Sequence, residues 1–162
     1  MESQTSYRGF KDLNCWREGR ELRKMISDLC KSLPDNEKFL LTSQMIRASR
    51  SITANIAEGY GRFTYTDTRH FFIQARGSVT EVLDHVILAQ DEGYVSVEMA
   101  ARLEEKAEIV FKLINGYIAY LERSQKLKTK NYLSIKLSKC GSTISEATLH
   151  RKSRENWLQW FQ

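Results

Sequence analysis

Apolar residues recur every three or four positions in four stretches of the chain. This spacing places them on one face of an α-helix, whereas a half-buried strand would show strict alternation. Pro34, Gly59-Tyr60-Gly61 and Gly93 mark the expected helix ends, because proline interrupts a helix and glycine accepts the left-handed conformation common at its C-terminus. Ser96 is the expected N-cap of the last stretch. The predicted helices cover residues 10–33, 36–58, 67–91 and 97–121.

The connections between these helices are only a few residues long, which favours antiparallel neighbours. The sequence therefore predicts an all-α fold: an up-down-up-down antiparallel four-helix bundle over residues 7–124, with a basic C-terminal extension over residues 125–162. One proline and eight glycines in 162 residues argue against an all-β fold, which needs many turns. No apolar stretch approaches the ~20 residues that cross a bilayer, so no membrane association is expected.

Residue types that often carry chemistry occur here without the spacing that chemistry requires. Cys15, Cys30 and Cys140 form no paired motif, so we expect neither a disulfide framework nor a zinc site, and a reducing cytoplasmic location is favoured. The sequence contains no HExxH, GxSxG or P-loop motif. We therefore expect a protein without enzymatic activity, metal or cofactor.

Small residues lie opposite the apolar stripe on the second and third predicted helices. A solvated face is usually rich in long charged side chains. Glycine within a helix lowers its stability by ~1 kcal/mol relative to alanine, a loss that close approach of another backbone would offset. We interpret this face as a contact surface with other copies of the chain; the alternative is a tolerated glycine on an ordinary surface. The residues on this face are Arg47, Ser51, Ala54, Glu58, Ile73 and Gly77.

The positive charge is concentrated at the C-terminal end. The formal net charge is +5; residues 126–162 contribute +6, from eight Lys and Arg against two Glu, and the first 125 residues sum to −1. A basic excess favours anionic partners such as nucleic acid. The alternative is a tail that only keeps the protein soluble.

Arginines and aromatic residues alternate around the connection between the second and third predicted helices. Tyr60, Phe63 and Tyr65 flank Arg62, and aromatic rings beside guanidinium groups suit single-stranded or looped RNA, whose bases are free to stack. The alternative is a turn whose aromatic rings pack on the bundle. The candidate nucleic-acid-binding residues are Arg47, Arg50, Arg62, Arg69, Arg76, Lys126, Lys128 and Lys130.

Two segments also resemble a known family. One runs from Gln44 to Arg62 and contains Asn55-Ile56-Ala57-Glu58-Gly59; the other runs from Phe71 to Glu81 and contains Gly77-Ser78. They resemble the signature of the bacterial four-helix-bundle family named after proteins encoded in intervening sequences of 23S ribosomal RNA genes, also labelled S23 ribosomal proteins. Phe10-Lys11-Asp12-Leu13 and Trp16 are similar to the start of that family's first helix, so the resemblance covers about residues 7–124.

This resemblance implies a bundle that assembles as a ring of five and needs no cofactor. It implies kinship with the accessory protein of diversity-generating retroelements, which works with a reverse transcriptase and its RNA. It also assigns Arg47, Asn55, Glu58, Gly77 and Glu81 to the assembly surface. The tail from about Gln125 departs from the family pattern, so its function lies outside the resemblance.

Two functional hypotheses follow. The first is a non-enzymatic homopentamer that binds RNA or another nucleic acid through its clustered arginines and its basic tail, with little sequence specificity. The second is a protein-interaction scaffold that docks a partner such as a reverse transcriptase, for which the acidic residues 77–125 and the apolar end of the tail would serve.

Overall fold

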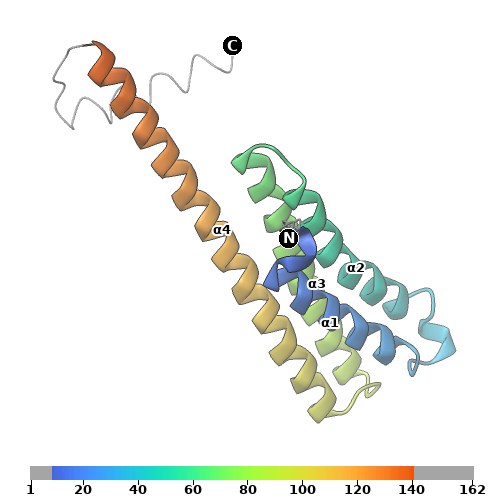
Figure 1. Ribbon diagram of the computed structural model, residues 1–162. Helices are drawn as coiled ribbons and strands as arrows, with labels where there is room; N and C mark the ends of the chain where they lie inside the picture. The colour runs from blue at the N-terminus through green and yellow to red at the C-terminus, as the bar shows by residue number, and fades with distance from the viewer. Residues whose placement is uncertain (1–8, 141–162) are drawn as a thin grey trace, which may run out of the picture. The chain divides into compact units, whose positions relative to one another are not determined.

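Four α-helices make up most of the computed structural model, which describes residues 9–140 (Figure 1). No strand occurs among these residues, so the predicted all-α four-helix fold is confirmed. The part of the predicted tail beyond residue 140 lies outside the described residues. The helices are α1 (Asn14–Cys30), α2 (Leu41–Tyr60), α3 (Tyr65–Asp91) and α4 (Val97–Cys140), with short 3₁₀ turns η1 (Phe10–Asp12) and η2 (Asp35–Glu37).

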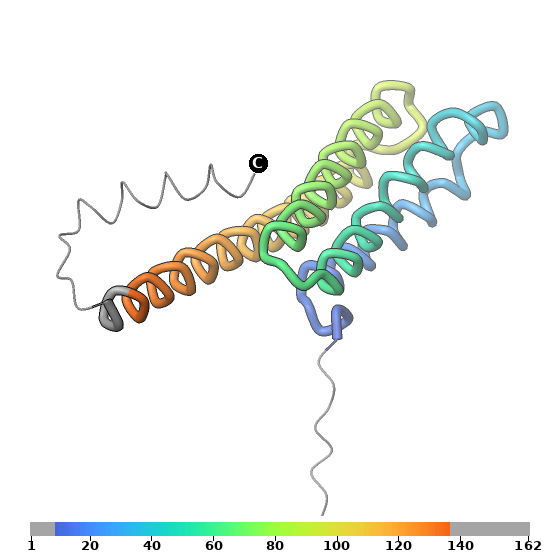
Figure 2. Tube along the Cα trace, turned by 90° about the horizontal axis from the view of Figure 1, so that it is seen from above, coloured from blue at the N-terminus to red at the C-terminus, as the bar shows by residue number. Residues whose placement is uncertain are grey.

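The chain divides into two compact units, residues 1–122 and 123–162. The first unit contains the bundle, formed by α1, α2, α3 and the portion of α4 up to Glu122. Within it, α2 packs against both α1 and α3 (Figures 1 and 2). The described part of the second unit is the remainder of α4, which continues as helix to Cys140.

The predicted apolar stripes form the core. Each of the four helices contributes residues that are less than one-tenth exposed, among them Leu22 and Ile26 of α1, Ile52 of α2, and Val110 of α4. Phe72 of α3 is fully buried, and its ring stacks on that of Tyr117 with 4.3 Å between the centroids. Burial of side chains of this size stabilises the fold by about 1.5–3 kcal/mol each.

The helix starts differ from the sequence-based boundaries, because short turns precede α1 and α2. The 3₁₀ turn η1 and an extended Leu13 delay α1 to Asn14, and η2 delays α2 to Leu41. Helix α3 begins at Tyr65, earlier than predicted, and is capped by Thr64. The Thr64 hydroxyl accepts a hydrogen bond from the Asp67 amide at 3.1 Å and lies 2.7 Å from the Asp67 carboxylate.

The glycines at the helix ends serve two different purposes. Gly93 follows the C-cap of α3 and has a φ of +72°, the left-handed conformation predicted for it. The same prediction is wrong for the end of α2, where Gly61 keeps a right-handed conformation. Gly59 is instead buried against α3: a Cβ atom there would lie 3.0 Å from Phe71 Cβ and 3.0 Å from the Phe72 ring. The absence of a side chain at Gly59 therefore sets how closely α2 and α3 approach.

Candidate nucleic-acid interface

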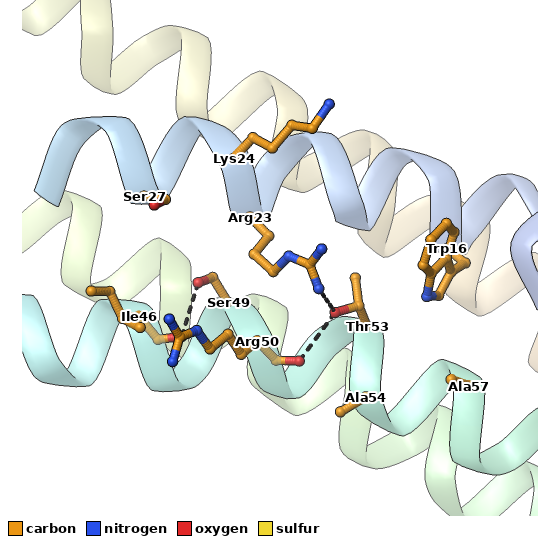
Figure 3. A pocket seen from close by; sticks show the side chains of 10 residues that line it. All are labelled: Trp16, Arg23, Lys24, Ser27, Ile46, Ser49, Arg50, Thr53, Ala54 and Ala57. Atoms are coloured by element: carbon orange, nitrogen blue, oxygen red, sulfur yellow. Dashed lines mark hydrogen bonds between the residues drawn. The ribbon is translucent and has the colours of Figure 1, made fainter.

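A groove of about 660 Å³ lies between α1 and α2 (Figure 3). Its α1 wall includes Trp16, Arg23 and Lys24, and its α2 wall includes Arg50 and Thr53. The small residues Ser27, Ser49, Ala54 and Ala57 complete the lining with Ile46, which leaves space between the two helices. None of these residues is acidic, so the groove presents three cationic side chains without a carboxylate in its wall.

One of the cations is held in place by the helix opposite it. The Arg23 guanidinium donates a hydrogen bond to the Thr53 hydroxyl at 2.9 Å, and that hydroxyl in turn donates to the Arg50 carbonyl oxygen at 3.2 Å (Figure 3). Thr53 is buried and Arg23 is half-buried. The Arg23 side chain is therefore fixed across the groove, with most of its five N–H donors still available.

Three arginines of α1 and α2 have no acidic partner among the described residues. Within the described part of the chain, Arg23, Arg47 and Arg50 form no ion pair, whereas Lys24 pairs with Glu21 at 2.9 Å. Arg47 and Arg50 also line a second hollow near the start of α2, together with Lys38 and the 85 % exposed Phe39. Positive charge without an acidic partner among the described residues thus lies at Arg23 on α1 and at Arg47 and Arg50 on α2.

The other predicted arginines are not gathered at this groove. Arg62, at the α2–α3 turn, pairs with Glu58, and its guanidinium lies 4.7 Å from the centre of the Phe71 ring. Arg69 pairs with Glu122 at 2.8 Å, and Arg76 donates to the Asn115 side chain at 3.1 Å. These contacts join α3 to α4, so Arg69 and Arg76 have structural partners within the bundle.

The lysines predicted to bind nucleic acid lie on the last part of α4, in the second unit. Lys126, Lys128 and Lys130 are all exposed. From Arg123 to Cys140 the helix contains no acidic residue. Its six basic residues are Arg123, Lys126, Lys128, Lys130, Lys136 and Lys139.

The aromatic residues at the α2–α3 turn have different environments. Phe63 is fully exposed, so the alternative, a turn whose aromatic rings pack on the bundle, is wrong for this residue. Tyr60 and Tyr65 are half-buried. Only Phe63 therefore offers an open ring face at this turn.

The structure divides the predicted assembly surface into two parts. Ser51 was expected to face away from the bundle, but its hydroxyl lies 2.8 Å from that of Ser78 on α3, and Asn55 donates to the Ser51 hydroxyl at 2.9 Å. Both residues are therefore engaged between α2 and α3 of one chain. The cause is geometric: Ser51 lies at the edge of the predicted face, on the side of α2 that packs against α3, so its hydroxyl contacts α3. Ala54 instead lines the α1–α2 groove.

The α3 part of that surface is open. A Cβ atom built on Gly77 would meet nothing within 4 Å. Gly77, Glu81, the half-buried Ile73 and Phe111 of α4 line a shallow hollow between α3 and α4. Arg47, Glu58 and Glu81 are exposed, as an assembly surface requires.

The remaining chemistry-bearing groups form no catalytic arrangement among the described residues. Burial raises the pKa of the Cys15 thiol to about 11 and also raises the pKa of Cys30, so neither is an activated nucleophile. His85 is buried, and its Nε2 has no hydrogen-bond partner. Residues 9–140 contain no group of three or more His, Cys, Asp or Glu side chains placed to hold a metal ion. None of the described helices combines the length and apolar character needed to cross a membrane.

Comparison with known proteins places this bundle in a family. The family model of the 23S rRNA-intervening sequence protein matches residues 11–116, from η1 to the middle of α4. The chain belongs to the 23S rRNA-intervening sequence protein family. The resemblance seen in Gln44–Arg62 and Phe71–Glu81 is thereby confirmed. A search of curated proteins found no match.

A solved structure shows the same fold. It is a protein of unknown function from the S23 ribosomal protein family of Bacteroides thetaiotaomicron, with a TM-score of 0.62 and 24% sequence identity. The similarity covers 67% of this chain and 98% of the other. The last part of α4 lies beyond the residues matched by the family model. Neither comparison names an enzymatic activity.

The groove residues of α1 were not among the predicted site residues. Trp16 and Arg23 are seven positions apart, which places them on one helix face two turns from each other. That spacing was a usable signal for a shared surface. Their pairing with Arg50 depends on how α1 packs against α2, which the periodicity of either helix alone does not specify.

Proposed function

We propose that this protein is a non-enzymatic oligomer, a ring of five chains, that binds RNA through clustered basic side chains. The observation that carries the proposal is the last part of α4, where six basic residues and no acidic residue follow the bundle. Arg47 and Arg50, which lack acidic partners among the described residues, supply a second region of positive charge. Such surfaces bind phosphates with little regard to sequence.

Assembly would strengthen this binding. Five chains with a formal net charge of +5 each would carry +25, and a ring would let several weak phosphate contacts act together. The open hollow beside Gly77 supports an assembly surface on α3, because no side chain of the described residues fills the space above that glycine. Arg47 and Glu81 are exposed for polar contacts between copies, and Glu58 is exposed although it pairs with Arg62.

Replacing Lys126, Lys128 and Lys130 together by glutamine tests the proposed function. We expect weaker binding to structured RNA in filter-binding titrations, and a shallower dependence of affinity on salt, because each lost phosphate contact reduces the slope by about 0.7–0.9. The matched control replaces Lys11, Lys31 and Lys112 by glutamine, which removes the same charge from exposed positions; Lys31 and Lys112 are already paired with acids. No binding at low salt, or binding indifferent to salt, would contradict the proposal.

Gly77→Leu tests the assembly surface. We expect a smaller assembled mass in light scattering with little change in helix content or unfolding, because the new side chain enters open space in the single chain but would obstruct a neighbouring copy. Unchanged mass would argue against this surface, and so would loss of the fold with assembly intact.

A protein-docking function is the second candidate, favoured by apolar side chains on the same part of α4. Leu127, Tyr132 and Ile135 are exposed among the lysines. A scaffold that docks a partner such as a reverse transcriptase would use such residues. If docking is the function, replacing these three by serine should abolish capture of a purified partner and leave RNA binding intact. Loss of RNA binding with partner capture unchanged would support the first function.

A further inference from the structure

We propose that the α1–α2 groove is a binding site for a single strand of RNA, with phosphates on Arg23 and Arg50 and a base stacked on Trp16. This inference rests on the proposed function and adds the site and the form of nucleic acid that it takes. Two of its residues, Trp16 and Arg23 of α1, were not predicted from the sequence to bind nucleic acid.

The charge of the groove defines the class of ligand. Three cations and no carboxylate line it, and two of them, Arg23 and Arg50, form no ion pair in residues 9–140. Elsewhere on the bundle the comparable arginines Arg62 and Arg69 are paired with glutamates. Arginine at an unneutralised site favours phosphate, because its planar fork of donors matches the oxygens bidentately.

Arg23 is also positioned before any ligand arrives. The Thr53 hydroxyl fixes its guanidinium across the groove, and Thr53 is itself tied to the α2 backbone (Figure 3). A side chain that is already ordered loses less conformational entropy when it binds. The hydrogen bond to Thr53 uses one of the five N–H donors, so the rest can reach a phosphate.

Trp16 supplies the surface for a base. It is half-buried at one end of the groove, and its ring makes an edge-to-face contact with Phe10 at 5.2 Å between ring centres. Ala54 and Ala57 line the groove with it and are too small to cover an indole. The rise of 1.5 Å per residue separates Trp16 from Arg23 by ~10 Å along α1, enough for a base and a neighbouring phosphate of one strand.

Trp16 favours a single strand over a duplex, because among the described residues it is the one aromatic residue that lines the groove and it stacks only on a base whose face is open. A base paired inside a duplex cannot present its face to Trp16, whereas an unstacked base can.

Tryptophan fluorescence gives a direct test in the full chain. The protein has three tryptophans, and replacing Trp157 and Trp160 by phenylalanine leaves Trp16 as the reporter. We expect an oligouridylate to quench its fluorescence in a saturable manner at low salt, and a blunt RNA duplex of the same length to leave it unchanged. Quenching by the duplex alone overturns the inference. The absence of quenching by either probe, when filter binding shows that the oligouridylate is bound, also overturns it.

Variants of the groove separate this site from the rest of the basic surface. In the full chain, Trp16→Leu should weaken oligouridylate binding by about 5- to 100-fold, and Trp16→Phe should restore most of the affinity by keeping an aromatic ring. Arg23→Ala and Arg50→Ala should each weaken binding and lower the salt slope by about 0.7. Arg20→Ala is the matched control, because Arg20 is a cation of α1 that does not line the groove.

The outcomes distinguish the two proposals. If the unsubstituted protein binds oligouridylate but Trp16→Leu, Arg23→Ala and Arg50→Ala bind equally well, this site is wrong and the proposed function stands. If the unsubstituted protein binds no RNA at low salt, the proposed function fails and the groove fails with it. A groove variant that lowers the assembled mass in light scattering would make the groove a contact between copies, which also overturns the inference.

Discussion

Phe72→Ala is expected to lower the free energy of unfolding by about 3–5 kcal/mol. The Phe72 ring is fully buried, stacks on Tyr117 of α4, and lies against the backbone of α2 at Gly59. Its removal therefore leaves a cavity where three helices meet. Denaturant unfolding followed by circular dichroism, with every variant at one protein concentration, measures the loss.

Phe63→Ala is the matched control for that experiment. It removes the same side chain from a fully exposed position, so the expected change is within about 0.5 kcal/mol. Equal losses for Phe72→Ala and Phe63→Ala would contradict the packing described for α3. The comparison also separates core packing from the effect of removing an aromatic ring as such.

Gly59→Leu is expected to lower the free energy of unfolding by about 1–3 kcal/mol or more, because a side chain there must push α3 away. Its Cβ atom alone would lie 3.0 Å from both Phe71 and Phe72, closer than ordinary van der Waals contact. Thermal and denaturant unfolding at fixed protein concentration measure the effect.

Gly77→Leu serves as the partner experiment, since it makes the same change in a neighbouring helix at a position with nothing within 4 Å. Leucine has a higher helix propensity than glycine, so the single chain should keep or gain stability. If both variants lost the same free energy of unfolding, the close approach of α2 and α3 at Gly59 would not explain the loss in Gly59→Leu. The two glycines thus separate packing inside the bundle from contact between copies.

The positions of the core residues could be predicted from the sequence, because the core depends on periodicity alone. The apolar positions that recur from Phe72 to Val86 in the third predicted helix are buried, and so are those from Ala100 to Leu121 in the fourth, apart from the half-buried Tyr117. The helix starts could not be predicted as well. They depend on local turns such as η1 and η2, whose hydrogen bonds compete with the first turn of a helix and leave no periodic signal.

The candidate site was less predictable, since it depends on which helices are neighbours. Ser51 and Ala54 lie on one side of α2 by their spacing, yet Ser51 bonds to α3 and Ala54 lines the groove with α1. Arg69 and Arg76 fit a basic surface by composition, but α4 brings Glu122 and Asn115 to them. A sequence shows that a side chain lies outside the core, but the packing of the helices determines which residues it contacts.

The continuation of α4 past Glu122 has a consequence for the energetics of recognition. From Arg123 to Lys136 no side chain is fully buried, so intrahelical hydrogen bonds contribute most of the stability of this helical segment. Its amide protons should exchange with solvent through local fraying, without waiting for the bundle to open. A ligand bound to it must then supply the ordering free energy itself, which lowers affinity for any one ligand and broadens the range of ligands it accepts.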